Sequence, residues 1–263
     1  MNTLSVKPTR SLLRIYALEA KYEFLKQLRL PAYVVPTLAF PLFFYVLFGL
    51  ALNRNASGMP GGIATYLLAT YGAFGVIAAT LFGFGIGVAT ERGQGWMSFK
   101  RATPMPTMAY FVAKTGMSLL FCALIVGALF LLGATAGGVR LPLGGWLALA
   151  GALLAGALPF CAFGLAIGYF AGPNSVPAVV NLIYLPSAFC SGLWIPIRYL
   201  PAWLQSIARF LPTYHYGQLA LRTVGIQGRE PVSTSLLALL VFTVLSLAAA
   251  RIGFRRDEGR TYG

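Results

Sequence analysis

Long apolar runs alternate with short polar segments along most of this chain. Six of the runs approach the ~20 residues that a helix needs to cross ~30 Å of hydrocarbon. They lie at about residues 32–52, 66–89, 110–133, 146–170, 176–195 and 235–253. This pattern predicts an all-α, polytopic membrane protein in which residues 1–263 form a single domain with six transmembrane helices.

The segment before the first run, residues 10–29, has a different pattern. Its apolar residues recur at three- and four-residue steps, and its basic residues occupy the other faces. This spacing predicts an amphipathic helix that lies along the membrane interface. A soluble helix packed on a partner would show the same pattern.

The segment between the last two runs is long and mixed in character. Pro201 suits the first turn of a helix, and Pro212 interrupts the pattern before a second short segment. Trp203 belongs to an apolar stripe at helical spacing, whereas Gln205 points elsewhere. We therefore predict one or two short re-entrant helices within residues 199–222, dipping into the outer leaflet. Three aromatic residues are expected to anchor them in lipid: Trp203, Tyr214 and Tyr216.

Small residues recur every four positions in the fourth run, which lets two helix backbones approach closely. The stripe comprises Ala148, Ala152, Gly156, Gly164, Gly168 and Gly172. Gly83 and Gly87 repeat the spacing in the second run. Either stripe could face another span of the same chain or a second subunit, and the pattern does not choose between them.

Two polar side chains, Asn181 and Ser187, lie within the fifth run. Polar side chains inside a membrane usually bond to a neighbouring helix or contact a transported solute. We favour an interhelical hydrogen bond and keep a contact in the substrate pathway as the alternative.

Composition and charge support a membrane location. Hydrophobic residues make up 58% of the chain and charged residues 10%, well below the roughly 25% of ordinary soluble domains. The net charge is +14, but the basic residues flank the apolar runs instead of forming a patch suited to nucleic acid. Most of them fall on one side of the predicted bundle, which places that side, with both termini, in the cytoplasm.

The sequence lacks the residues that several classes of function require. None of the six Asp and Glu residues sits in the middle of a run, which counts against an ion-driven carrier. His215 is the single histidine, so the sequence offers no zinc site and no catalytic motif. No phosphate-binding loop occurs. We expect no bound cofactor or metal, and any ATP and Mg²⁺ would be held by another subunit.

Residues 91–106, ERGQGWMSFKRATPMP, follow the second run. They resemble the cytoplasmic loop of ATP-binding-cassette type-two (ABC-2) exporter permeases, particularly those of the drug- and antibiotic-resistance type. Gly93 and Trp96 stand where the family usually has a second acid and a threonine. The matching residues are Glu91, Arg92, Gly95, Thr103 and Pro104.

A second segment, residues 191–222, resembles the end of the fifth span and the outer hairpin of the same family. The matches occur in order at Ser191, Gly192, Pro196, Leu200, Pro201, Trp203, Leu204, Gln205 and Pro212. The interface helix and the six-span layout agree with the family as well, so the resemblance covers nearly the whole chain.

The resemblance implies a permease subunit of the bacterial inner membrane that exports a hydrophobic or amphipathic compound, such as a drug, a lipid or a lipid-linked glycan. Two ATP-binding-cassette subunits would dock beneath it, and a second identical or related permease would complete the pathway. The loop would form a coupling helix, in which the residues that contact the ATPase would be Glu91, Arg92, Gly95, Trp96 and Phe99.

Two other classes of function stay open at this point. A stand-alone carrier or lipid-modifying enzyme would need intramembrane carboxylates or a catalytic cluster, and the sequence shows neither. A non-transporting scaffold or sensor would need only the packing of the spans. A neighbouring coding sequence with a phosphate-binding loop would favour the transporter.

Overall fold

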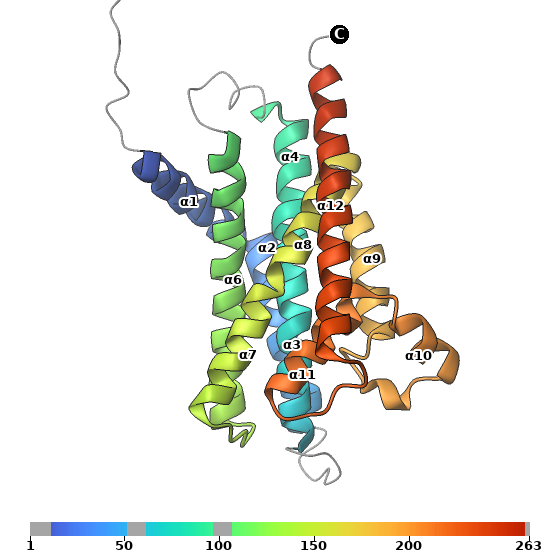
Figure 1. The fold of residues 1–263 in the computed structure, drawn as a ribbon. Helices are drawn as coiled ribbons and strands as arrows, with labels where there is room; N and C mark the ends of the chain where they lie inside the picture. The colour runs from blue at the N-terminus through green and yellow to red at the C-terminus, as the bar shows by residue number, and fades with distance from the viewer. Residues whose placement is uncertain (1–11, 52–61, 97–106, 261–263) are drawn as a thin grey trace, which may run out of the picture.

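The computed structural model describes residues 12–51, 62–96 and 107–260, and within these ranges every regular element is a helix (Figure 1). The predicted all-α fold is therefore confirmed. The elements are α1 (Leu12–Leu28), α2 (Pro31–Phe44), η1 (Tyr45–Ala51), α3 (Gly62–Thr80), η2 (Leu81–Ile86), α4 (Gly87–Gly93), α6 (Thr107–Thr135), α7 (Leu143–Ala155), α8 (Ala157–Phe170), α9 (Val176–Cys190), η3 (Ile197–Tyr199), α10 (Ala202–Ala208), α11 (Pro212–Thr223) and α12 (Val232–Arg260).

Five helical stretches are long and apolar enough to cross a membrane. Together with the shorter apolar helix α9, they place an apolar segment at each of the six predicted positions, as expected for a multi-pass membrane protein. The long stretches are Tyr33–Ala51, Gly62–Gly93, Met108–Thr135, Leu143–Phe170 and Val232–Asp257.

The fifth apolar segment stays helical over a shorter length than its composition suggests. α9 ends at Cys190, although the apolar run continues to residue 195. Gly192 has φ +77°, which ends the helix, and an added Cβ there would lie 2.9 Å from the Cβ of Ile197. The Tyr66 hydroxyl donates to the Gly192 carbonyl at 2.7 Å. This bond helps to satisfy the non-helical backbone that follows α9.

The fourth span bends at Gly156, where α7 gives way to α8. Pro159 has no N–H to donate to the carbonyl of Ala155, so the regular hydrogen-bond ladder is interrupted at this point. The bend also makes room for a neighbour, because a Cβ at Gly156 would overlap the ring of Tyr216.

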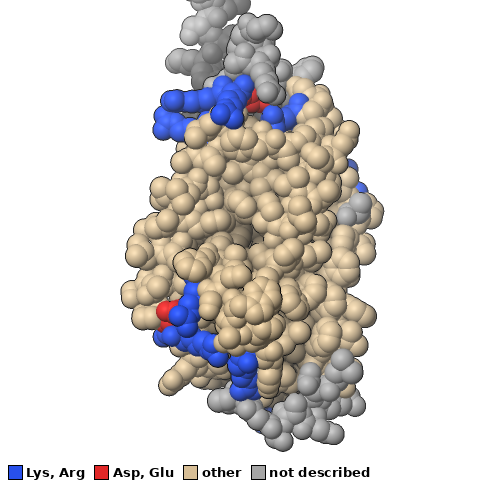
Figure 2. All heavy atoms as spheres, turned by 90° about the vertical axis from the view of Figure 1, so that its right-hand side faces the viewer, with Lys and Arg blue, Asp and Glu red and all other residues tan. Residues whose placement is uncertain are grey.

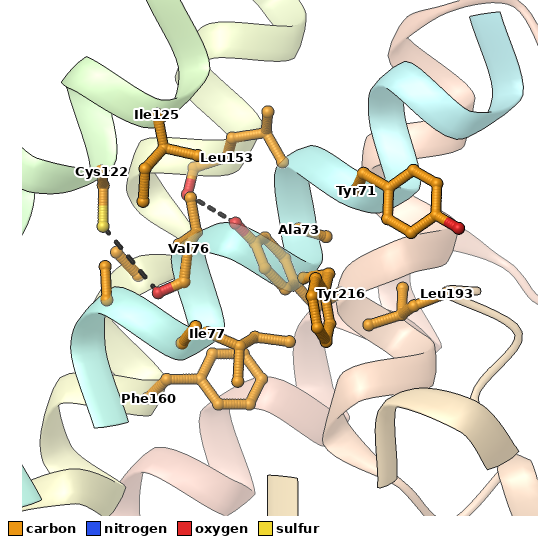
Figure 3. Close-up of a cluster of buried hydrophobic side chains, with 14 of the residues drawn as sticks. Tyr71, Ala73, Val76, Ile77, Cys122, Ile125, Leu153, Phe160, Leu193 and Tyr216 are labelled. Carbon is orange, nitrogen blue, oxygen red and sulfur yellow. Dashed lines mark hydrogen bonds between the residues drawn. The ribbon is translucent and has the colours of Figure 1, made fainter. Parts of the chain in front are cut away.

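The second span, formed by α3, η2 and α4, is the centre of the bundle and is the most buried of the long stretches. α2, α6, α8 and α11 all contact it. Figure 3 shows the core beside α3, where Tyr216 of α11 packs against Phe160 and donates to the Leu153 carbonyl at 2.7 Å. The hydroxyl is thus satisfied deep inside the apolar core.

The small-residue stripe of the fourth span packs against the second span of the same chain. A Cβ on Gly164 would lie 2.9 Å from the Cβ of Phe84, and one on Gly168 would lie 2.8 Å from the Cβ of Val88. Only glycine allows the two backbones this approach. At these two positions the question left open by the sequence is resolved in favour of intramolecular packing.

The two short helices before the last span have different environments. Pro201 precedes α10 and Pro212 begins α11. Trp203 on α10 is 64% exposed, as expected of an anchor in lipid. The prediction of the same role for Tyr214 and Tyr216 is wrong, because α11 inserts into the bundle and buries both side chains.

Charged residues gather toward the two ends of the molecule and leave a broad band without them on the face shown in Figure 2. One end carries α1, the turn between α8 and α9, and the end of α12 (Figure 1). We call it the basic end. The other end carries α10 and the loops beside α11, and we call it the opposite end. The uncharged band between them matches the surface of a protein surrounded by hydrocarbon.

Candidate functional site

An apolar groove of about 760 Å³ runs along the bundle between α2, the second span and α9. Its wall on the second span extends from Phe74 to Gln94, which rises about 30 Å in a helix and equals the hydrocarbon thickness of a bilayer. Phe40, Asn181 and Leu185 line the groove and are exposed, so it is open along one side. Its aromatic residues are Tyr33, Phe40, Phe44, Phe74, Phe82, Tyr184 and Trp194.

These aromatic side chains hold one another in place. The rings of Phe74 and Tyr184 stack with centroids 4.8 Å apart, and Phe82 meets Tyr184 edge-on at 6.1 Å. The Tyr184 hydroxyl donates to the Phe74 carbonyl at 3.0 Å, which ties α9 to α3. Trp194 packs edge-on against Phe74 at 5.6 Å. The result is a pre-formed apolar wall of the kind that binds flat or amphipathic molecules.

Polar atoms are sparse along this wall. The Trp194 indole nitrogen is buried and has no hydrogen-bond partner among the described residues. Asn181 lies in the groove and donates to the Pro177 carbonyl of its own helix at 3.0 Å. Ser187 is not part of the groove lining and donates to the Tyr184 carbonyl. Both side chains thus donate within α9. Neither forms the interhelical hydrogen bond that the sequence favoured.

At the basic end, the groove meets four charged side chains and one tyrosine that we call the charged cluster: Glu23, Lys26, Glu91, Tyr110 and Lys114. The buried Lys114 ammonium, 1% exposed, lies 2.5 Å from Glu23 Oε1 and 3.1 Å from Glu91 Oε1. The Tyr110 hydroxyl donates to Glu91 Oε2 at 2.6 Å. Lys26 donates to Glu91 as well. Three elements, α1, α4 and α6, are joined by these contacts.

The charged cluster balances two ammonium groups against two carboxylates. Buried charges are tolerated when they are paired and hydrogen-bonded, so each member depends on the others. Burial lowers the pKa of the Lys26 ammonium, but the charges of Glu91 and Glu23 outweigh burial and raise that pKa above its usual value of 10.5. Gly87 leaves space for Lys114, whose ammonium would lie 3.1 Å from an added Cβ there.

The groove and the charged cluster share residues. Lys26 and Glu91 line the basic end of the groove, and Gln27 and Gln94 lie beside them. Because the two charges are paired with each other, this end offers polar atoms without a net charge. A molecule in the groove would therefore meet an aromatic body and a polar, electrically balanced end.

Of the five residues predicted to contact an ATPase, the structure describes Glu91, Arg92, Gly95 and Trp96, and their environments differ. Glu91 is buried in the charged cluster, whereas Gly95 and Trp96 are exposed in the turn that follows α4. Gly95 has φ +75°, which suits this turn to glycine. Phe99 lies outside the described residues.

Arg92 also bonds within the chain. Its guanidinium donates to Asp257 Oδ1 at 3.0 and 2.9 Å and to the Gly168 carbonyl at 2.7 Å. It lies 5.4 Å from the ring of Tyr169. The side chain therefore joins the second span to α8 and α12.

The predicted outer residues also take part in local structure. Gln205 donates to the Leu200 carbonyl at 2.7 Å and accepts from Arg229 at 2.6 Å. Both bonds lie at the opposite end, outside the groove.

Sequence reasoning missed Glu23, Tyr110 and Lys114. The sequence patterns assign no role to these three residues. The available signal was the position of Lys114 several residues inside an apolar helical run, where a charge is costly unless it is paired. Within the described ranges no group of three or more His, Cys, Asp or Glu residues could hold a metal ion.

Comparisons with known proteins agree with one another. A family model described as "ABC-2 family transporter protein" matches residues 52–252. The chain is 30% identical over 236 residues to the putative transport permease YvfS of Bacillus subtilis (strain 168), a match that covers 90% of this chain and 95% of that protein. It is 27% identical over 196 residues to the probable multidrug ABC transporter permease YbhR of Escherichia coli (strain K12). That match covers 72% of this chain and 51% of the relative, so the chain spans about half the length of YbhR.

Proposed function

Since the chain belongs to the ABC-2 family of transporters, we propose that it is the permease half of an ATP-driven exporter of hydrophobic or amphipathic compounds. Family membership makes it a membrane subunit of an ABC transporter that works with an ATP-binding-cassette subunit. Export, the class of substrate and the composition of the complex are our proposals.

The single observation that carries the proposal is the groove. Its length equals the membrane thickness, its wall is aromatic, and the Lys26 and Glu91 charges at its basic end are paired. Such a surface stabilises an apolar or flat solute through burial and ring packing. It offers no unpaired charge that would select an ion. The exposed Asn181 side chain supplies a polar group in the groove lining.

The basic end is the cytoplasmic end in this proposal, within the bacterial inner membrane. Lys and Arg residues are enriched on the cytoplasmic side of membrane proteins, and the exposed basic residues of α1 and of the end of α12 lie at this end. Two ATP-binding-cassette subunits, each binding ATP and Mg²⁺, would dock here against the turn that contains Trp96. Movement of the docking surface would reach the mouth of the groove through the charged cluster, because Glu91 belongs to the cluster and also lines the groove.

A second permease subunit would cover the open side of the groove. Phe40 and Leu185 line this side and are exposed, and Leu182 on α9 is 75% exposed. An identical chain or a related one would bury these side chains and enclose the pathway. A cysteine placed at position 182 should then form cross-linked dimers in native membranes, whereas a cysteine at Leu237 on the lipid-facing α12 should form few.

A transport assay tests the proposed pathway. The chain would be reconstituted with its ATP-binding subunit in inverted proteoliposomes, and ATP-dependent uptake of ethidium, as an amphipathic probe, would be measured. Phe82→Ala removes a ring from the groove and should reduce the initial rate about fivefold, the effect of losing roughly 1 kcal/mol of ring contact. Phe210→Ala removes an equally large ring from an exposed position outside the groove and should leave the rate unchanged.

Equal effects of the two variants, with equal amounts of folded protein, would rule out the groove as the pathway. Uptake that requires an ion gradient and no ATP would instead support a stand-alone carrier. Absence of any probe movement with an active ATPase subunit would favour a scaffold or sensor.

A further inference from the structure

A second, smaller groove lies on the lipid-facing side of the bundle, between α8, α9 and α12. Its volume is about 440 Å³, and its apolar lining includes Phe163, Ala166, Ile167, Phe170, Val179 and Ala249. From Phe163 to Phe170 the wall on α8 rises about 10 Å toward the basic end. The α12 span is the least buried of the long stretches, so this face borders lipid.

The side chain of Arg256 lies at the mouth of this groove that faces the basic end. The Arg256 guanidinium lies 5.9 Å from the ring centroid of Phe170, which lines the groove. Arg256 follows Ala249 by two helical turns, so both residues face the same way, about 10 Å apart along α12. Arg256 is exposed, and no hydrogen bond or ion pair engages its side chain within the described ranges.

The mouth has no described carboxylate free to neutralise this charge. Asp257, the next residue, is engaged with Arg92 on the second span. Ser175, at the start of α9, contributes a hydroxyl to the groove lining. The Ser175 hydroxyl donates to the Gly172 carbonyl at 3.2 Å, so an anion at this mouth would be held chiefly by the Arg256 guanidinium, beside the apolar groove.

We infer that this groove binds an anionic phospholipid of the cytoplasmic leaflet, with one acyl chain along α8 and the phosphate at Arg256. The groove takes an apolar chain, the arginine takes a phosphate, and the two are arranged along the membrane normal in the order that a lipid requires. The inference rests on the membrane orientation proposed above and not on the transported substrate. Basic pockets between spans are suited to anionic headgroups on physical grounds.

Lipid binding to the purified full-length chain tests the inference. Native mass spectrometry in detergent would count bound phosphatidylglycerol as its concentration is raised, with phosphatidylcholine of the same acyl chains as the zwitterionic comparison. Phosphatidylglycerol should bind at least about fivefold more tightly, and Arg256→Gln should remove most of that preference, as expected for one cation near an anionic headgroup.

Two variants separate the site from general attraction. Arg251→Gln removes the same charge from the same helix, but position 251 lies two residues from Ala249 and so faces away from the groove. It should leave the preference within about twofold. Ala249→Leu keeps every charge and fills the groove, and it should weaken binding of phosphatidylglycerol several-fold. The elution volume on size exclusion confirms that each variant is folded.

Equal losses for Arg256→Gln and Arg251→Gln would show surface attraction alone and overturn the inference. Equal binding of the two lipids, or no effect of Ala249→Leu in a folded protein, would overturn it as well. The assay needs neither ATP nor the ATP-binding subunit, so failure of lipid binding and failure of the proposed transport are observed separately.

Discussion

The two ends of the bundle are held together by different chemistry. At the basic end, ion pairs join elements that are far apart in the sequence: Lys114 with Glu23 and Glu91, and Arg92 with Asp257. In the core and toward the opposite end, buried hydroxyl groups bond to backbone carbonyls, as in Tyr216 to Leu153 and Tyr66 to Gly192. The described ion pair at the opposite end, Arg209 with Glu230 at 3.5 Å, is largely exposed on its arginine side.

This difference separates a part of the molecule that can be rearranged from a part that is fixed. A buried ion pair depends on both partners, and an approaching charge or a change in one partner alters the balance of the whole set. A hydroxyl bonded to a backbone carbonyl inside a packed core contributes about 1 kcal/mol and has no alternative partner nearby. We expect movement driven by an ATPase to act on the ionic end, while the opposite end serves as a rigid support.

The substitution expected to have the largest effect on stability is Lys114→Met, at the basic end. The substitution leaves a buried carboxylate without its partner and should lower the free energy of unfolding by about 3–5 kcal/mol. Thermal unfolding in detergent, followed by tryptophan fluorescence, measures the loss. The double variant Lys114→Met/Glu23→Gln restores the charge balance and should recover a large part of it. If the double variant loses as much stability as Lys114→Met and Glu23→Gln lose separately, added together, the cluster is not an interdependent unit.

In the core where α7 packs on α11, stability should depend on how closely the side chains fit. Gly156→Val places side-chain atoms where the ring of Tyr216 packs and should cost about 1–3 kcal/mol by overpacking. Gly151→Val is the matched control, because an added Cβ at Gly151 meets nothing within 4 Å. The same unfolding measurement applies, and similar costs at the two glycines would contradict the close packing of α7 on α11.

Tyr216→Phe tests the hydrogen bond in the same region separately from the packing, because it removes the hydroxyl and keeps the ring. The Leu153 carbonyl loses a buried partner, and the free energy of unfolding should fall by about 1 kcal/mol. Chemical denaturation of the purified protein would detect this loss. A loss as large as that of Lys114→Met would mean that the two ends do not differ as described.

The smallest effect is expected within the charged cluster itself. The Lys26 side chain is 47% exposed, so solvent compensates for its removal. Lys26→Met should therefore cost less than about 1 kcal/mol of unfolding free energy, even though Lys26 contacts the same carboxylate as Lys114. Equal costs for Lys26→Met and Lys114→Met in thermal unfolding would show that burial does not set the strength of these pairs.

The sequence predicted the features that repeat locally. The apolar runs place the spans, Pro201 and Pro212 mark the starts of the two short helices, and Gly164 and Gly168 provide a close-packing stripe. These signals depend on spacing along one helix, and the structure confirms the fold class that they define.

The features that the sequence did not predict depend on distant pairs. Glu23, Glu91 and Lys114 lie on three helices separated by tens of residues, and no local pattern brings them together. The burial of Tyr214 and Tyr216 was missed for a related reason, because an aromatic residue near a polar loop has the same local signature in lipid and in a protein core. The end of α9 at Cys190 depends on Gly192, whose left-handed backbone is not visible in hydropathy.

The most direct test of the central claim is the ATPase activity of this chain purified with its ATP-binding subunit in lipid. Glu91 and Arg92 are poor positions for the test, since both support the fold. Trp96 and Trp203 are two exposed tryptophans at opposite ends of the molecule. Trp96→Ala should uncouple or abolish the lipid-embedded ATPase activity while the complex still assembles, whereas Trp203→Ala should leave that activity within about twofold of wild type. If no ATP-binding subunit copurifies, or if both substitutions leave its activity unchanged, the assignment of the basic end as the coupling surface is contradicted.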